Sequence, residues 1–427
     1  MGFPRVSETF IASELYRVEQ AGIPVRLFVL KPVEERERGL RHPVVDAIRA
    51  EPEYLPSTLP LTAPLHRWRP AHLRPFGPAL RRVLHERPRG FGQAVRIALG
   101  QALRDRRTRL SGPRKVYLKE LIQSVALADR LLDAPEVRHL HAHFAHGTTT
   151  VTWLAATIVG LPFSFTGHAR DIYAKGLNPR GWLRRKLLAA RFAVTCTEAN
   201  RRHLFCIAPE ATVHLVYHGL GADFDRLLRA AAPGTPKRNG EVSVLGVGRL
   251  VAKKGFDVLV EACAVLNRRG VPFDARIIGQ DDKHGGEIRR RIAALGLEHR
   301  IALPGPMGQD ELLSEYRGAT ALCAPCRVLD EDRDGIPNVI VEAMAAGAPV
   351  VATTVSGIPE LVEDGANGLT VPVEDPEALA DALLRLHRDP ELAERLTRAA
   401  RDTVRDRFDG ERLGRRLAHL FQETLAA

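Results

Sequence analysis

Two cations follow a predicted buried strand in the second half of the chain. Residues 244–255 predict a strand, a glycine-containing turn and the start of a helix, with Gly248, Arg249 and Lys254 in the turn. Two fixed cations beside the start of a helix suit a diphosphate, whose charge they can neutralise and orient. Two solvated surface cations are the alternative, because exposed charges usually contribute little.

Two carboxylates accompany the start of a later helix. Asp334 lies in the loop before this helix, and Glu342 lies one turn inside it on an otherwise apolar stretch. An unpaired buried carboxylate is costly, so Glu342 requires a partner: the hydroxyl groups of a ribose or sugar, or a nearby arginine in a structural salt bridge. The free N–H groups at the helix start can hold a phosphate. The residues at this helix start, Gly335, Ile336, Pro337 and Asn338, are candidates for binding such a ligand.

The elements that position these residues alternate between strand and helix. Predicted strands and helices follow one another with short loops over residues 137–217 and again over residues 242–387. Residues 230–240 are rich in turn formers and predict a linker. Such alternation predicts parallel sheets flanked by helices, and two such units place a ligand cleft between the carboxyl ends of their strands. Residues 31–118 show only short periodic runs, whereas residues 390–425 predict a helical tail.

Six motifs in sequence order resemble family 4 glycosyltransferases of the GT-B fold. The motifs of the second half are Gly248-Arg-Leu-x-x-x-Lys-Gly255, Glu342-Ala-Met-Ala-x-Gly-x-Pro-Val-Val351 and Gly357-Ile-Pro-Glu-Leu-Val-x-x-Gly-x-Asn-Gly368. The first half looks like the branch that builds exopolysaccharides such as colanic acid. Its motifs are Phe3-Pro-Arg-x-Ser-Glu-Thr-Phe10, His141-Ala-His-Phe-Ala145 and Phe165-Thr-Gly-His-Ala-x-Asp-Ile172.

The resemblance implies an α/β fold of two facing Rossmann-like domains with parallel sheets. Residues 1–232 would bind the acceptor, residues 241–400 would bind the nucleotide sugar, and residues 401–427 would form a helix packing back on the first domain. The family begins with a strand ahead of the motif at residues 3–10, so we expect the first sheet to lack this strand and Met1 to lie downstream of the true start. Another departure is Ile278-Gly-Gln-Asp-Asp282, where the family often has Gly-x-Gly-Pro.

The resemblance also implies a reaction. A sugar would pass from a UDP- or GDP-linked donor to a glycan or a polyprenyl-diphosphate-linked saccharide, with retention at the anomeric carbon and without a metal. Arg249 and Lys254, beside Gly248, would bind the diphosphate and stabilise charge on the leaving nucleotide. Glu342 would accept hydrogen bonds from the ribose. Asp334 stands at the first position of the family's two-glutamate motif and would contact the transferred sugar.

Further site residues are implied in both halves. His168 follows a predicted strand and would face the sugar from the first domain, although a core histidine bonded to backbone is the alternative. Ser356 and Glu360 would line the donor pocket, unless Glu360 caps its own helix. The acceptor-side candidates are Glu8, His143 and Asp171.

Length and composition limit the classes of protein that remain. The chain has 427 residues, of which 45% are hydrophobic and 26% charged, and this fits two or three globular domains. No apolar run could cross a bilayer, and the first residues lack a signal-peptide pattern, so with only five cysteines we expect a cytoplasmic protein. We expect no metal site, because residues 330–334 are interpreted as a solvated loop and Cys323 with Cys326 is a single pair.

The net charge of +11 is concentrated in one segment. Residues 66–119 contain 13 Arg and 2 Lys against Glu86 and Asp105. Basic and apolar side chains together favour an anionic membrane surface, so we expect peripheral binding at the inner face of the cell membrane. A solvated helix surface is the alternative. We expect no nucleic-acid partner, because no nucleic-acid module accompanies the segment.

Two other classes of protein remain as alternatives. A Rossmann oxidoreductase that uses NAD needs a complete glycine fingerprint, and Gly246-x-Gly248-x-x-Val251 lacks the third glycine. The other alternative is a non-catalytic basic membrane-binding protein. Such a protein would not need Arg249, Lys254, Asp334, Glu342 and His168 together at a ligand cleft. The sequence leaves open the sugar, the nucleotide, the acceptor and the oligomeric state.

Overall fold

The computed structural model describes residues 3, 9–31, 43–59, 65–106, 114–220, 228 and 240–426. The chain forms two compact units, and each is described by itself. The first unit holds Met1–Cys196, Asn200–Val216 and Glu411–Ala427, and the second holds Thr197–Ala199 and Tyr217–Gly410. The predicted domain boundary at residue 232 falls outside the described residues.

The second unit is built on a six-stranded sheet in which every pairing is parallel. Its strand order is β12-β11-β10-β7-β8-β9. The strands are β7 (Val242–Val247), β8 (Phe273–Ile278), β9 (Ile301–Gly305), β10 (Ala321–Ala324), β11 (Val350–Thr353) and β12 (Leu369–Val371). This sheet confirms the α/β class that the alternating pattern predicts.

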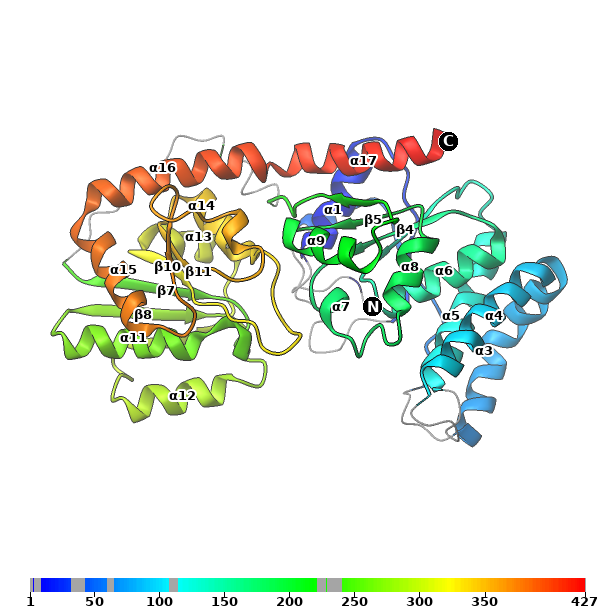
Figure 1. Ribbon diagram of the computed structural model, residues 1–427, viewed down its shortest axis with the longest axis horizontal. Coiled ribbons are helices and arrows are strands. Elements are labelled where there is room, and N and C mark those ends of the chain that lie inside the picture. Colours follow the sequence, from blue (N-terminus) through cyan, green and yellow to red (C-terminus); the bar gives the residue numbers. More distant parts are fainter. Residues whose placement is uncertain are drawn as a thin grey trace. The chain divides into compact units, whose positions relative to one another are not determined.

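Helices cover both faces of this sheet, with α11 and α12 on one side and α13 and α14 on the other (Figure 1). The strand residues divide accordingly: Val242 and Val244 of β7 belong to one buried core, and Leu245 and Val247 to the other. The alternation arises because successive side chains of a strand point to opposite faces. The helices are α11 (Phe256–Arg268), α12 (Gly285–Ala294), α13 (Gln309–Gly318), α14 (Asn338–Ala346), α15 (Pro376–Arg388) and α16 (Pro390–Arg407), with short 3₁₀ turns η3 (Ala252–Lys254) and η4 (Ile358–Glu360).

The first unit contains a four-stranded parallel sheet in the order β3-β4-β5-β6 and a separate parallel pair, β1 and β2. The strands are β1 (Leu27–Val29), β2 (Pro52–Tyr54), β3 (Leu140–His143), β4 (Phe163–Gly167), β5 (Phe192–Thr195) and β6 (Val213–Leu215). Its helices are α1 (Thr9–Gln20), α2 (Pro43–Asp46), α3 (Leu65–Glu86), α4 (Pro88–Arg104), α5 (Lys115–Leu132), α6 (Gly147–Val159), α7 (Arg170–Tyr173), α8 (Trp182–Ala189), α9 (Glu198–Ile207) and α17 (Gly410–Ala426). The first two residues of α9, Glu198 and Ala199, and the first residue of α17, Gly410, belong to the second unit.

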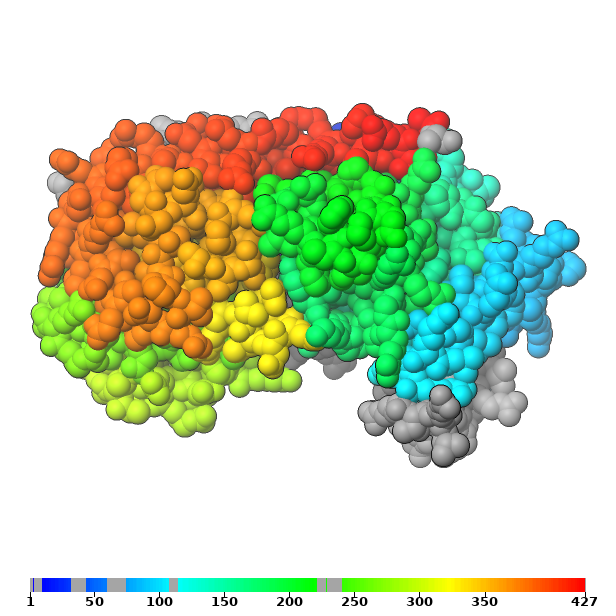
Figure 2. Space-filling model, in the orientation of Figure 1, coloured from blue at the N-terminus to red at the C-terminus, as the bar shows by residue number. Residues whose placement is uncertain are grey.

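Residues 31–118, whose sequence shows only short periodic runs, contain the long helices α3 and α4 and the start of α5. Residues of α3 and α4 form one rim of the first unit on the face shown in Figure 2. Helix α3 forms although it contains prolines, since Phe76, Ala79 and Val83 are buried at helical spacing. Burial of this stripe outweighs the low helix propensity of the sequence.

Helix α17 completes the first unit. The ring of Phe421 lies 5.0 Å from that of His141 in β3 and 6.0 Å from that of Phe192 in β5, measured between centroids. No helix among the described residues combines the length and the apolar character needed to cross a membrane.

Candidate active site

Strand β7 ends at Val247, and the residues that follow carry the two predicted cations. Gly248 has a φ of +148°, a conformation that favours glycine. A Cβ atom on Gly248 would lie 3.2 Å from Cε of Lys254, so the lysine side chain passes directly over this glycine. The turn η3 ends at Lys254, and Gly255 connects it to α11.

Asp334 lies between two lysines. Its Oδ2 is 2.7 Å from Nζ of Lys254, and its Oδ1 is 3.1 Å from Nζ of Lys253. Burial raises the pKa of the Asp334 carboxyl, but the two ammonium groups outweigh burial and hold this pKa well below its usual range. Burial likewise lowers the pKa of Lys254, and the attraction of Asp334 more than compensates, so this pKa is raised. Both groups are therefore charged at neutral pH.

Glu342 lies in α14 and is held by a tyrosine. The hydroxyl group of Tyr316, which is fully buried in α13, donates to Oε2 of Glu342 at 3.1 Å. Burial raises the pKa of Glu342 to about 6, although this hydrogen bond and the charge of Lys254 act in the opposite direction. Within the part of the chain that the structure describes, Glu342 makes no ion pair with an arginine. Lys254 thus acts electrostatically on both carboxylates.

Two helix starts adjoin these charges. The residues that precede these helices, Gly255 before α11 and Pro337 before α14, make no capping hydrogen bond with a side chain of their own. Their first N–H groups can therefore bind an anion. The segment from Gly335 to Asn338 packs against the loop before η4, since a Cβ atom on Gly357 would lie 2.9 Å from Ile336.

Arg249 forms an ion pair with Asp282, with Nη1 and Oδ2 3.1 Å apart. Asp282 belongs to the segment that departs from the family pattern. The Arg249 side chain is 47% exposed, and an ion pair this exposed is weak. A diphosphate could therefore take the place of Asp282.

Ser356 and Glu360 differ in the hydrogen bonds that their side chains make. Ser356 has a φ of +52°, and within the described ranges its buried hydroxyl oxygen has no hydrogen-bond partner. Glu360 instead accepts hydrogen bonds from the backbone N–H groups of Glu198 and Ala199 and from the hydroxyl group of Tyr217, all in the second unit. Its carboxylate therefore caps residues other than its own helix.

In the first unit, His168, His143 and Asp171 come together at the carboxyl ends of β3 and β4. The two imidazole rings stack with centroids 5.6 Å apart. Asp171 accepts hydrogen bonds from the N–H groups of Ala145 at 2.7 Å and His168 at 3.1 Å. Burial raises the pKa of Asp171 in spite of these bonds. Asp171 thus fixes the loop that carries His168, and Glu8 lies outside the described residues.

A buried lysine outside the sequence motifs forms hydrogen bonds with the same loops. Lys186 donates from Nζ to the carbonyl groups of Ala145 and His146, both at 2.9 Å, and to Oδ1 of Asn178 at 2.8 Å. Burial lowers the pKa of Lys186 to about 7. In the sequence, Lys186 follows Arg184 and Arg185 and looks like one more surface cation.

Glu14, His141 and His143 are close enough to act as metal ligands in the first unit. Both ring nitrogens of His141, however, already face hydroxyl groups, Ser164 Oγ at 2.7 Å and Thr166 Oγ1 at 2.9 Å. These contacts account for the burial of His141 without a metal.

Comparison with known proteins identifies the family. Residues 241–389 match the family described as "Glycosyl transferases group 1". The chain is 32% identical over 314 residues to a D-inositol 3-phosphate glycosyltransferase of Saccharomonospora viridis, and the alignment covers 67% of this chain and 70% of that relative. The chain belongs to the group 1 glycosyl transferases.

Two further relatives are named for polysaccharide biosynthesis. WcaL of Salmonella typhimurium, named for colanic acid, is 37% identical over 211 residues, covering 48% of this chain and 50% of the relative. AmsK of Erwinia amylovora, named for amylovoran, is 37% identical over 180 residues, covering 42% of this chain and 44% of the relative. The chain thus spans about half the length of these relatives.

Solved structures share the fold. Anabaena HepE, in complex with UDP and glucose, has a TM-score of 0.66 at 16% identity, covering 99% of this chain and 97% of that one. Sucrose-phosphate synthase from Thermosynechococcus elongatus has a TM-score of 0.60 at 22% identity, covering 74% and 81%. These matches confirm the predicted resemblance to glycosyltransferases of the GT-B fold.

Proposed function

We propose that this chain is a family 4 glycosyltransferase that acts with retention and without a metal. It would move a sugar from a UDP- or GDP-linked donor to a glycan or lipid-linked saccharide in exopolysaccharide biosynthesis. The observation that carries the proposal is the placement of Lys254, which pairs with Asp334 and acts electrostatically on Arg249 and Glu342. The ammonium group of Lys254 thus interacts with the other three charged residues that the family motifs assign to the donor.

Each residue has a role that its surroundings allow. As the bond between the anomeric carbon and the diphosphate breaks, negative charge grows on the leaving group, and Arg249 and Lys254 would stabilise it. The helix starts at α11 and α14 would supply further N–H donors. Glu342 would accept hydrogen bonds from the ribose, and Asp334 would contact the transferred sugar. The part of His168 in the transfer stays a prediction.

The relatives narrow the substrate class. HepE was solved with UDP and glucose, and WcaL and AmsK are named for colanic acid and amylovoran biosynthesis. A nucleotide-diphosphate hexose and a polysaccharide precursor are therefore the substrates we propose.

A panel of nucleotide sugars tests this function. We expect saturable binding and slow hydrolysis of at least one UDP- or GDP-sugar, measured by calorimetry and by release of the nucleotide, with no change on addition of a chelator. NAD serves as the competing ligand. Binding of NAD with no binding of any nucleotide sugar would favour the oxidoreductase instead.

We further propose that α3 and α4 dock on an anionic membrane, at the inner face of the cell membrane. Leucines spaced four residues apart, and hence on one side of each helix, are exposed at Leu80 and Leu84 of α3 and at Leu99 and Leu103 of α4. Exposed arginines accompany them at Arg74, Arg81, Arg87, Arg89 and Arg96. Exposed apolar and cationic side chains together are what binds anionic lipid surfaces. The side chains of residues 66–73 and all of residues 107–113 lie outside the described part of this segment.

Replacing Arg81, Arg87 and Arg89 by glutamate should release the protein from anionic vesicles. At about 1 kcal/mol for each cation near the surface, partitioning should fall at least a hundredfold. The measurement is co-sedimentation with phosphatidylcholine vesicles with and without phosphatidylglycerol. The matched control makes the same charge change on α12, at the exposed residues Arg289, Arg290 and Arg291. If the wild-type protein sedimented equally with both kinds of vesicle, the membrane proposal would be wrong and α3 and α4 would form a solvated helix surface.

A further inference from the structure

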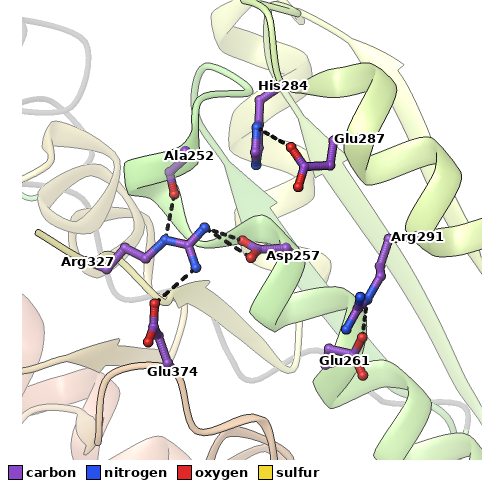
Figure 3. Close-up of polar contacts among 8 residues, drawn as sticks. All are labelled: Ala252, Asp257, Glu261, His284, Glu287, Arg291, Arg327 and Glu374. Carbon is purple, nitrogen blue, oxygen red and sulfur yellow. Dashed lines mark hydrogen bonds and ion pairs between the residues drawn. The ribbon is translucent and has the colours of Figure 1, made fainter. Parts of the chain in front are cut away.

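Arg327 lies just beyond β10 and is the hub of a hydrogen-bond network around the lysine turn (Figure 3). Its Nε donates to the carbonyl group of Ala252 at 2.9 Å, and its backbone N–H donates to the carbonyl group of Lys253 at 2.9 Å. Nη2 lies 3.0 Å from both carboxylate oxygens of Asp257, and Nη1 lies 3.3 Å from Glu374. The side chain is only 13% exposed.

Apart from Arg327, the turn η3 is held by the ion pairs of its two lysines and by its own backbone hydrogen bonds. No residue of η3 is buried, so apolar packing does not fix Ala252, Lys253 or Lys254. The chain passes very close to the segment after β10, because a Cβ atom on Gly255 would lie 1.9 Å from the carbonyl oxygen of Pro325. The hydrogen bonds of Arg327 join the backbone carbonyl groups of Ala252 and Lys253 in η3 to this segment.

The position of the turn η3 determines where the ammonium groups of Lys253 and Lys254 lie. Lys253 and Lys254 leave η3 toward Asp334, and their ammonium groups lie within 3.1 Å and 2.7 Å of its carboxylate. Electrostatic stabilisation of a diphosphate depends steeply on the placement of such groups. A guanidinium group suits this task because its planar fork can bridge several acceptors at once.

We propose that Arg327 is a positioning residue for the diphosphate-binding lysines. It does not touch the donor; it fixes the backbone of η3 so that Lys254 and Lys253 meet the phosphates. The inference rests on the proposed donor site. Arg327 lies outside every sequence motif and more than seventy residues from the turn that it contacts, so the sequence alone does not indicate this role.

The test compares the affinities of UDP and uridine, or of GDP and guanosine, by calorimetry and competition. Arg327→Ala should weaken the diphosphate by about tenfold or more and leave the nucleoside within about twofold, because only the phosphate contacts move. A merely structural loss would lower the folded fraction and weaken both ligands alike. Arg327→Lys, which keeps the charge but not the fork, should show a smaller fall in the same ratio.

Arg269 provides the matched control. It also pairs with two carboxylates, Glu377 and Asp381, but it ties α11 to α15 away from the turn. Arg269→Ala should leave the ratio of UDP to uridine affinity unchanged. If Arg327→Ala and Arg269→Ala behave alike, the positioning role is overturned while the donor site stands. If the wild type binds neither UDP nor GDP, the donor site falls and this inference falls with it.

Discussion

Replacing Lys254 by alanine should lower kcat/KM for the nucleotide-sugar donor by a factor of about 10²–10³. The substitution removes the cation nearest to Asp334 and leaves that carboxylate with Lys253 alone. It also removes the positive charge that lowers the pKa of Glu342. One change therefore alters the diphosphate site and the environment of both carboxylates.

The native pair is insensitive to moderate changes of pH. The pKa of Asp334 is lowered, so its contribution to stability is present at neutral pH and is lost only in strong acid. The pKa of Lys254 is raised, so its contribution is lost only in strong base. Both members of the pair are therefore charged between about pH 5 and 9. A change with pH in the effect of Lys254→Ala on donor binding within this range is expected from Glu342, whose pKa of about 6 the substitution raises further.

Thermal unfolding separates binding from stability in this experiment. A saturating donor should raise the Tm of the wild type, because only the native state binds it, and should not raise that of Lys254→Ala. Lys253→Ala is the control, since it leaves the contact of 2.7 Å between Lys254 and Asp334 in place, and we expect a smaller loss. A value of kcat/KM in Lys254→Ala close to that of the wild type would contradict the electrostatic role.

The second unit could be predicted from sequence because its rules are local. Most of its strands are short apolar runs followed by a turn and a helix, as in Val242–Val247 and α11. The edge strand β9 (Ile301–Gly305) is not among the predicted strands, because only part of it is buried and it contains Pro304. The helices α3 and α4 could not be predicted in this way. Their prolines and arginines obscure the pattern, and only the burial of residues such as Val83 and Ala94 against the rest of the first unit makes them helical.

The candidate site also contains some residues that local sequence patterns predict and others that only the fold brings together. Lys254, Asp334 and Glu342 lie in motifs whose spacing follows the turn and the helix that carry them. Tyr316 and Arg327 reach the same place from other elements, and their contacts with Glu342 and Ala252 span 26 and 75 residues. No local pattern encodes such a contact. A buried carboxylate predicts that a partner exists, but only the fold shows which residue it is.

Glu342→Gln should abolish donor binding and at the same time stabilise the free protein. Burial raises the pKa of Glu342 from 4.5 to about 6, so the ionised group costs the native state about 2 kcal/mol at neutral pH. Because the native state holds its proton to a higher pH than the unfolded state does, the stability of the wild type should fall as pH rises between these two values and stay low above them. An amide removes this cost but cannot replace the carboxylate as the acceptor for two ribose hydroxyl groups.

The measurement is Tm as a function of pH, together with calorimetry of the donor. At neutral pH, Glu342→Gln should melt several degrees above the wild type, and the difference should vanish near pH 4, where both side chains are neutral. Tyr316→Phe is the opposing control: it removes the hydroxyl group that lowers the pKa of Glu342, so the wild-type penalty should grow and Tm at neutral pH should fall. If Glu342→Gln were less stable than the wild type at neutral pH and still bound donor, Glu342 would be a structural residue. A carboxylate that destabilises the free protein has a binding role, because it gains its missing hydrogen bonds only when the ligand is bound.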